Sequence, residues 1–264
     1  MDISTDDLDA LRRAKSLLEN VSLAARVANA VGTPVEKLFG LLPEGAAGFI
    51  LSATNKSLTA GLKFAVSTLD DRPQPSTNWV HKTAVAFTGA VGGVFGFATL
   101  AVELPASTVI MLRSIADVAR SEGEPLHAVE TKLACLQVFA LGGPGPADDA
   151  AESAYFAVRV ALAKALAEAA EHLAERGLVQ QGAPAVLRFT SQVAARFGIP
   201  VSEKVMAQSV PVLGAAGGAM INLLFIHHFQ ELARGHFTVR RLERKYGPER
   251  VKRAYLALGP VPRP

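Results

Sequence analysis

Hydrophobic residues recur along most of this chain at the three- and four-residue spacing of an amphipathic helix. The stretch from Thr5 to Ala30 illustrates the pattern, because Leu8, Leu11 and Leu18 fall near one face of a single helix. Strand-like alternation of polar and β-branched residues is absent from the sequence. The pattern therefore predicts an all-α fold, a multi-helix bundle.

Prolines and glycines set the expected helix boundaries. We expect Pro105 to begin a helix that continues to Arg120, because proline is favoured at the first helical position. A helix that begins near Pro184 is expected to end at Gly198. Further helices are expected over residues 44–69 and 126–141 and through the basic stretch that ends near Tyr246.

The strongest linker signal is the run GGPGPA at residues 142–147. Asp148 follows it and can cap an alanine-rich helix that ends at Gly177. We divide the chain into an N-terminal helical segment, residues 1–40, and a helical domain, residues 41–258.

Two long uncharged, glycine-rich segments interrupt the amphipathic pattern. They run from Thr83 to Val102 and from Val205 to Ile226, and as helices each would be about 30 Å long, close to the hydrocarbon thickness of a bilayer. Their G-x-x-x-G spacings are typical of helices that approach each other closely, so we expect the two segments to form central helices packed against each other. Insertion into a membrane and burial as a tight hairpin in a soluble bundle both remain open. The spaced glycine pairs are Gly89 with Gly93, Gly92 with Gly96, and Gly214 with Gly218.

Composition and charge favour an apolar setting with one basic end. Half of the residues are hydrophobic, 19% are charged, and the mean hydropathy is +0.26. The net charge is only +3, but basic residues concentrate near the C-terminus and could attract anionic headgroups. These eight residues are Arg234, Arg240, Arg241, Arg244, Lys245, Arg250, Lys252 and Arg253.

Cysteine content and the first residues indicate a cytoplasmic protein. Cys135 is the single cysteine, so a disulfide within the chain and a cysteine-rich metal site are excluded. The acidic start, MDISTDDLDALRRAK, lacks the order of a secretory signal, so we do not expect secretion. We expect a cytoplasmic protein that associates peripherally with the inner membrane.

Polar residues in apolar surroundings are the candidate site residues. Glu103 ends the first glycine-rich segment, and a carboxylate there needs a partner. Arg113, Asp117 and Arg120 share a helix face. We expect Arg113 and Asp117 to be buried and paired, with Glu103 close enough to join them. An ion-pair network that orients helices and a polar site for a headgroup or metal both fit this pattern.

Histidines suggest a second, weaker site. His227 and Glu231 lie one helical turn apart, with His228 and His236 nearby, a spacing that can hold a metal. No H-E-x-x-H motif, phosphate-binding loop or nucleophile elbow is present, and no cofactor is expected. Few aromatic residues accompany the basic stretch, so nucleic acid is not an expected partner.

Several runs resemble the EcsC family of bacterial proteins. They are Glu103-Leu104-Pro105, LRSIADVARSEGEPL from Leu112, and HHFQELARGHFTVRRLERKYG from His227. The resemblance implies no established reaction, cofactor or catalytic residue. Gly235 is a local variation, which we expect to loosen that turn slightly. The resemblance implies a polar framework made of Glu103, Pro105, Arg113, Asp117, Glu130, His236, Arg240, Arg241 and Glu243, to which we add His227 as a candidate ligand-binding residue.

The function expected from these features is non-enzymatic. We expect a membrane-associated helical protein that binds a lipid or other hydrophobic ligand between helices, with the eight basic residues contacting anionic headgroups. A membrane-surface metal-dependent hydrolase that uses Glu103, His227, Glu231 and His236 is the alternative enzyme. A structural interaction protein that serves a transporter or secretion system, with a protein partner, is the third possibility.

Overall fold

The computed structural model describes residues 3–19, 23–32, 45–69, 100–142, 153–177, 183–208 and 214–259. These ranges form helices and contain no strand, which confirms the all-α prediction. The elements are α1 (Thr5–Glu19), α2 (Leu23–Val31), α4 (Ala46–Thr68), α6 (Leu100–Ser121), α7 (Val129–Gln137), η2 (Val138–Ala140), α8 (Ala154–Arg176), α9 (Pro184–Gln208), α10 (Gly214–Tyr246) and α11 (Pro248–Ala257).

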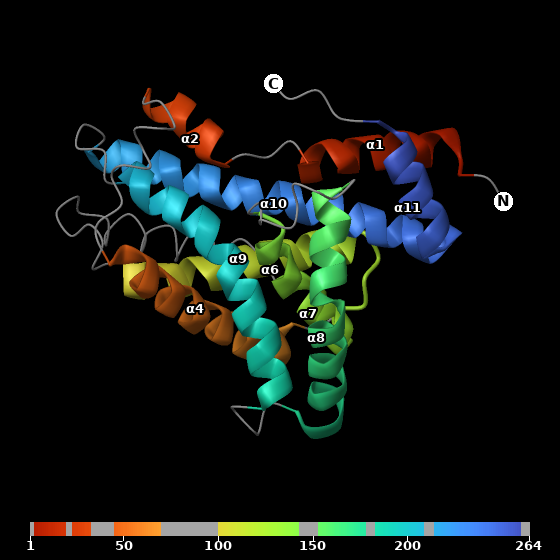
Figure 1. The fold of residues 1–264 in the computed structure, drawn as a ribbon, viewed down its shortest axis with the longest axis horizontal. Coiled ribbons are helices and arrows are strands. Elements are labelled where there is room, and N and C mark those ends of the chain that lie inside the picture. Colours follow the sequence, from red (N-terminus) through yellow and green to blue (C-terminus); the bar gives the residue numbers. More distant parts are fainter. Residues whose placement is uncertain are drawn as a thin grey trace.

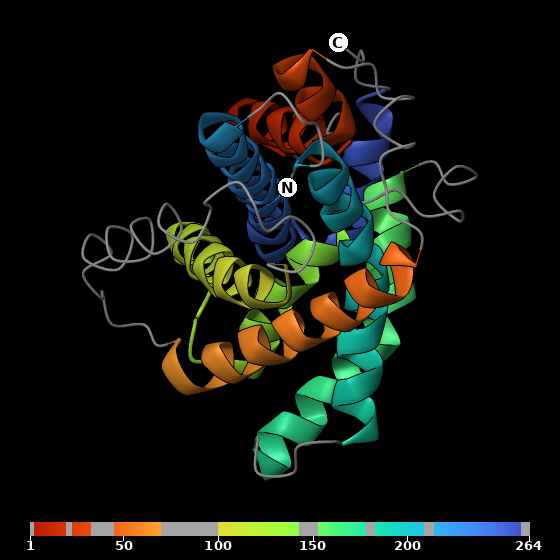
Figure 2. The same ribbon diagram turned by 90° about the vertical axis from the view of Figure 1, so that its left-hand side faces the viewer.

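Helix α10 is the longest element and organises the bundle. Its 33 residues run across the molecule and contact α1, α2, α6, α9 and α11 (Figure 1). Helix α4 packs on α6 and α9, while α8 and α9 form a hairpin that projects away from α10 (Figures 1 and 2). Most of the described apolar side chains meet in one core between these helices.

An aromatic cluster lies at the centre of this core, where η2, α9 and α10 meet. Phe139 contacts Phe197 and Phe229 with ring centroids 4.8 and 5.2 Å apart, and Phe225 contacts Phe229 at 5.2 Å. Tilted and edge-on ring pairs at these separations add to the stabilisation from burial alone. The cluster therefore fixes α9 and α10 against the short segment that follows α7.

Helices α6 and α10 lie side by side and point in the same direction. Gln230 donates to Ser114 at 2.8 Å, Thr238 to Glu122 at 3.1 Å, and Arg240 to Glu124 at 2.8 Å, and each pair is separated by 116 positions. A constant offset between rising residue numbers is the signature of a parallel pair. Both helices therefore begin at the same end of the molecule, which faces the viewer in Figure 2. We call this end, comprising residues 100–112 of α6 and 214–230 of α10, the α6/α10 start.

Two predicted helix boundaries are wrong, because burial outweighs the local breaking signals. Pro105 lies inside α6, which begins at Leu100. The carbonyl that loses its donor belongs to Ala101, an exposed residue of the first turn, so water can reach it. Helix α9 continues through Gly198 and Pro200 to Gln208, with Pro200 itself buried in the core.

Other boundaries agree with the sequence or differ by a few residues. The helix expected over residues 44–69 is α4, and α10 ends at Tyr246 before a positive-φ Gly247, as predicted. The helix expected from Thr5 to Ala30 is described as two helices, α1 and α2, and the one expected over residues 126–141 as α7 followed by η2. Ser153 is the N-cap of α8, where it accepts from the Phe156 N–H at 3.4 Å, and Gly177 ends the helix as predicted.

Some expectations fall outside the described residues. Asp148, most of the linker at residues 142–147 and the first glycine-rich segment up to residue 99 are among them. The predicted packing of residues 83–102 against residues 205–226 therefore stays a prediction. No helix in the described ranges is both long enough and apolar enough to cross a bilayer.

Helix α1 belongs to the same core as the helices of the expected 41–258 domain. Leu11 and Ala14 are buried against α10. At Gly235, an added Cβ would lie 2.7 Å from Leu18 Cγ and 3.0 Å from the Ala14 carbonyl oxygen. Gly235 therefore allows close approach of α1, in place of the slight loosening expected from the sequence.

Candidate functional site

The turn after α6 receives arginines from the C-terminal half of α10. Glu124 is buried, and its carboxylate accepts two hydrogen bonds from Arg240, at 2.8 and 3.0 Å. Arg244 pairs with the same carboxylate, and Thr131 of α7 donates to it at 3.3 Å. Arg240 and Arg244 are four residues apart, so the helical repeat places both over the same acidic side chain.

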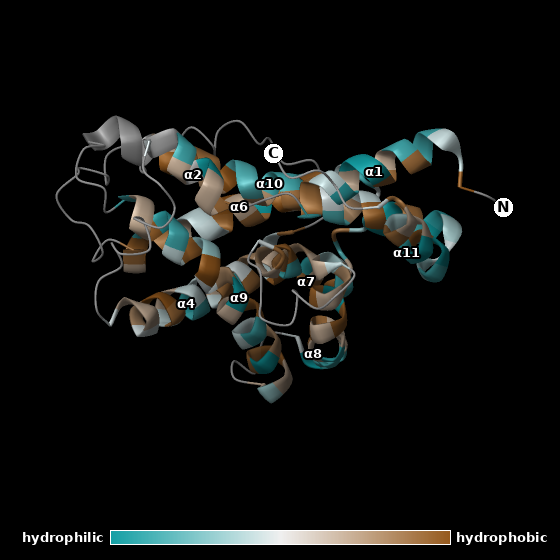
Figure 3. Cartoon of the chain, turned by 45° about the horizontal axis from the view of Figure 1, so that its top comes forward, coloured by the Kyte–Doolittle hydropathy of each residue, from teal (hydrophilic) through white to brown (hydrophobic). Residues whose placement is uncertain are grey.

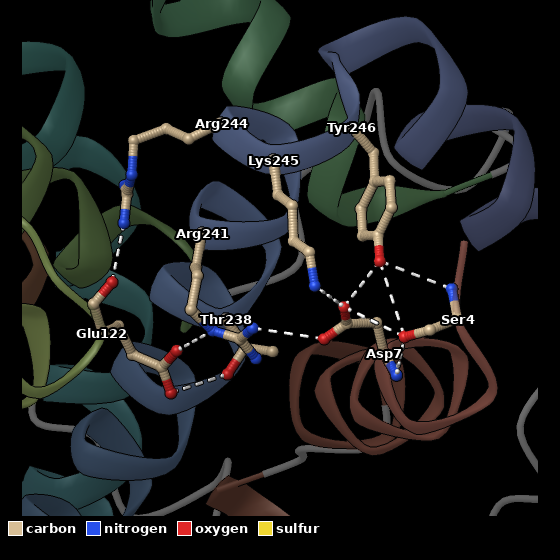
Figure 4. Close-up of polar contacts among 8 residues, drawn as sticks. All are labelled: Ser4, Asp7, Glu122, Thr238, Arg241, Arg244, Lys245 and Tyr246. Atoms are coloured by element: carbon tan, nitrogen blue, oxygen red, sulfur yellow. Dashed lines mark hydrogen bonds and ion pairs between the residues drawn. The ribbon is translucent and has the colours of Figure 1, made fainter. Parts of the chain in front are cut away.

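Glu122, at the same turn, extends the network toward α1 (Figure 4). Its carboxylate accepts from Arg241 at 2.7 Å and from Thr238 at 3.1 Å. Arg241 also contacts Asp7 of α1 at 3.3 Å. Lys245 and Tyr246 donate to the other oxygen of Asp7 at 2.7 and 2.8 Å. Asp7 of α1 and Glu122 of the turn after α6 thus bind the same face of α10.

The basic side chains stabilise the ionised form of both buried carboxyls. Hydrogen bonds from Lys245 and then Tyr246 lower the pKa of Asp7 well below its ordinary value. Burial by itself raises the pKa of Glu124, but the hydrogen bonds and charges of Arg240 and Arg244 outweigh it and leave the pKa lowered. Both carboxyls are therefore ionised acceptors, which makes them unsuited to proton donation at neutral pH.

A second polar chain runs from α8 to α10. Arg159 forms two hydrogen bonds with Glu243, at 2.7 and 2.9 Å, and a third with the Tyr155 hydroxyl at 3.2 Å. The Tyr155 hydroxyl lies 3.0 Å from Nδ1 of the fully buried His236. Burial, reinforced by the charges of Arg159 and Arg240, lowers the pKa of His236 well below its ordinary value. His236 is therefore neutral, as a hydrogen-bonded member of the core.

The structure gathers some of the predicted site residues and separates the others. His236, Arg240, Arg241 and Glu243 all lie on the second half of α10, and each has a polar partner from another element. Glu130 lies exposed on the first turn of α7. The framework therefore lies in the C-terminal half of α10, and Glu130 does not belong to it.

The expectation that Arg113 and Asp117 are buried is wrong, and Glu103 pairs with a residue of α9. Asp117 accepts from Arg120 at 2.9 Å, and 44% of its side chain is exposed. Glu103 pairs at 2.5 Å with Lys204 of α9, a buried lysine. Arg113 is only half-buried on α6. The helical repeat placed residues 113, 117 and 120 on one face, but that face is turned partly to solvent.

The histidine pattern likewise has a different arrangement. His227 is exposed, whereas His228 is buried with Nε2 at 3.3 Å from the Gly142 carbonyl oxygen. Burial lowers the pKa of His228 to about 4. Glu231 pairs with Arg26 of α2 at 2.5 Å. Within the described residues, no three His, Cys, Asp or Glu side chains lie where they could hold one metal ion.

Sequence reasoning missed the partners of the framework. These are Asp7, Glu122, Glu124, Tyr155, Arg159 and Lys204. A signal for two of them was present, because Glu122 and Glu124 flank a glycine in a chain whose C-terminal helix is rich in arginine. The positions of Tyr155, Arg159 and Lys204 depend on how α8 and α9 pack, which helical periodicity does not specify.

The polar framework therefore holds the helices together. Each of its acidic side chains meets at least one basic or hydroxyl group, and together they join α1, the α6–α7 turn and α8 to α10. Cys135 is fully buried, and burial raises the pKa of its thiol, so it is not an activated nucleophile.

Comparison with known proteins gives one match. A model of the EcsC protein family matches residues 6–242, a range that runs from α1 through most of α10. No curated protein and no solved structure matches the chain.

Proposed function

This chain belongs to the EcsC protein family, and we propose that it is a non-enzymatic, membrane-associated helical protein that binds a lipid or other hydrophobic ligand between its helices. The observation that carries the proposal is the parallel register of α6 and α10. Both helices therefore begin at one end of the molecule, and each is preceded in the sequence by uncharged residues, 83–99 before α6 and 209–213 before α10. Large apolar side chains are also exposed on both helices, Val102 on α6 and Leu223 on α10, and exposed apolar surface favours contact with lipid.

The paired basic residues change how such a contact would be driven. Arg240, Arg241, Arg244 and Lys245 contact Asp7, Glu122 or Glu124, so at least four of the eight basic residues are engaged within the fold. They also lie at the far end of α10, whose 33 residues correspond to about 50 Å. The paired basic residues therefore lie far from the start of α10, and the proposal rests on apolar contact with lipid more than on charge.

Lipid analysis and vesicle flotation test the proposal. The protein purified without detergent should carry lipid that mass spectrometry identifies, and it should float with phosphatidylcholine vesicles at both low and high salt. Binding that needs anionic lipid and disappears at high salt would show instead that the basic residues near the C-terminus drive the contact with lipid. A protein that carries no lipid and stays out of every vesicle fraction would overturn the proposal and favour a structural interaction protein.

The alternative hydrolase gains no specific support from the described residues. His227 is exposed, Glu231 is paired with Arg26, and His236 is buried beside Tyr155. Stoichiometric zinc in the purified protein would be the observation that favours the hydrolase.

A further inference from the structure

Helix α8 exposes apolar side chains on the face turned away from the core. Val160 is 70% exposed, and Ala163, Ala167 and Ala174 are exposed as well. Their spacing of three, four and seven residues places these four side chains along one face of the helix, and we call them the α8 row. The buried residues of α8, such as Leu162, lie on the other side. Burying the α8 row would therefore remove apolar surface from water without disturbing the core.

The composition of α8 is unusual for a helix at the surface. Such a helix normally carries polar residues on the side opposite the core, and α11 and much of α1 are coloured hydrophilic in Figure 3. In α8, nine of the 23 residues are alanine, and four small or branched apolar side chains form the exposed row. Small side chains allow two helices to pack at a short distance. The α8 row is therefore suited to contact with another helix.

Charged side chains follow the α8 row along the same face of the helix. Lys164 is basic, whereas Glu171 and Glu175, further along the helix, are acidic, and all three are exposed. Lys164 lies 3.9 Å from Glu168, whose carboxylate binds Arg188 of α9 more closely, at 2.5 Å. The Lys164 side chain remains 87% exposed, so it is open to a further carboxylate.

The charges of this face are complementary to those of a second, antiparallel copy. Ala167 lies next to the midpoint between Lys164 and Glu171 along the helix. A two-fold axis through this midpoint places Lys164 of each copy level with Glu171 of the other, and it brings Ala167 of the two copies together. Because the axis is perpendicular to the helix pair, the charged side chains of both copies stay on the same side of the contact. A parallel pair in register would instead place Glu171 against Glu171.

We propose that two copies of this chain form a symmetric dimer in which their α8 helices pack antiparallel through the α8 row. The α8–α9 hairpin projects from the rest of the molecule, so a second hairpin can lie alongside it (Figures 1 and 2). One helix from each copy makes a contact smaller than a standard stable interface, so the dissociation constant should be on the order of micromolar or weaker.

The dimer goes beyond the proposed function and does not depend on it. Helix α8 begins beside the second half of α10, where Arg159 binds Glu243, whereas the exposed side chains that favour lipid contact, Val102 and Leu223, belong to the α6/α10 start. A protein that carries no lipid would therefore leave the dimer standing.

Introduced cysteines test the contact, because Cys135 is fully buried and is the single cysteine of the chain. Ala167→Cys should form a disulfide-linked dimer under mild oxidation, since the two-fold axis brings the two positions within bonding reach. Ala161→Cys is the matched control, because Ala161 is an exposed alanine of the same helix that lies off the α8 row. Equal rates of linkage in the two variants, or linkage in neither, would overturn the proposal.

Exchange of the charges tests the antiparallel arrangement. In sedimentation equilibrium, Lys164→Glu should weaken dimerisation by about fivefold or more, because two ion pairs become two repulsions, and Glu171→Lys should do the same. The double variant Lys164→Glu with Glu171→Lys should restore dimerisation. Lys56→Glu changes an exposed lysine of α4 and should leave it unchanged. A double variant as weak as the single ones, or a wild-type protein that stays monomeric at every concentration, would overturn the proposal.

Lipid is the other occupant that an apolar helix face could take. Ala167→Cys labelled with NBD should show blue-shifted emission as the protein concentration rises, with no vesicles present. A shift that requires phosphatidylcholine vesicles and is absent on self-association would assign the α8 row to lipid. That result would overturn the dimer while leaving the proposed function intact.

Discussion

Gly235 of α10 and Leu18 of α1 approach so closely that an added Cβ at Gly235 would lie 2.7 Å from Leu18 Cγ. The Ala14 carbonyl oxygen, 3.0 Å from the same position, belongs to the backbone and cannot move aside independently. Close helix contact through glycine, which the sequence suggested for the glycine-rich segments, is thus observed at a different glycine.

We expect Gly235→Ala to reduce the free energy of unfolding by about 1–3 kcal/mol, because the methyl group overpacks the α1–α10 contact. Gly48→Ala is the matched control. Gly48 is also helical, an added Cβ there meets nothing within 4 Å, and the substitution should raise stability by up to about 1 kcal/mol. Urea denaturation measures both changes, and a stabilising Gly235→Ala would contradict the close contact.

Removing the buried acceptor in the α6–α7 turn should be strongly destabilising. Glu124→Ala leaves Arg240 and Arg244 without their common carboxylate, and breaking a buried pair in this way costs about 3–5 kcal/mol. The exposed pair of Asp9 with Arg12 provides the control, since Asp9→Ala should cost less than about 1 kcal/mol. Similar losses in the two variants would show that Glu124 is not buried as described.

The Tyr155 hydroxyl should stabilise the core through His236 and Arg159. In Tyr155→Phe both groups lose a hydrogen-bond partner, so we expect a loss of about 1–3 kcal/mol. Because the pKa of His236 is held well below its ordinary value, the loss should be equal at pH 6 and pH 8. A loss that grows steeply toward pH 6 would mean that His236 carries a proton in the fold.

Glu203 of α9 should give the stability a pH dependence opposite to that of the paired carboxyls. Burial raises its pKa from 4.5 to about 7, although a hydrogen bond from the Ala24 backbone opposes the shift. Between these two values the folded chain binds the proton that the unfolded chain releases, so stability from this group is present below pH 4.5 and is lost as the pH rises to 7. Glu203→Gln should therefore gain stability relative to wild type over this range, by up to about 3 kcal/mol.

Comparing Glu203→Gln with wild type at each pH cancels the contributions of all other groups. A difference between the two proteins that stays constant from pH 5 to pH 8 would contradict the raised pKa. Asp7 and Glu124 have lowered pKa values, so their contribution is present above their ordinary pKa and is lost in acid.

The sequence predicted the helical class and several boundaries, because helical periodicity and glycine or proline signals are local properties. It predicted α4 and the end of α10 within two residues. It failed at Pro105 and Gly198, where packing of the neighbouring residues in the core outweighed the preference of one residue.

The framework residues were only partly predictable, because the sequence specifies spacing along one helix but not the contacts between helices. Residues on one helix, such as Arg240 and Arg241, could be grouped by spacing alone. Their acceptors Asp7 and Glu124 lie more than 100 positions earlier, and their placement depends on how α1 and α6 pack. Lys204 was missed because a charged residue near an apolar segment gives no indication of its partner in sequence.

The contact between Asp7 and Lys245 joins residues 238 positions apart, and this has a consequence for synthesis. At about 5–20 residues per second, α1 emerges from the ribosome on the order of 10–50 s before the part of α10 that covers it. During that interval Leu11 and Leu18 have no native partner on α10, so the nascent chain must be kept from aggregating by other means. The last long helix to be made is also the one that closes the fold, so folding should behave as a late, post-translational event dominated by long-range contacts.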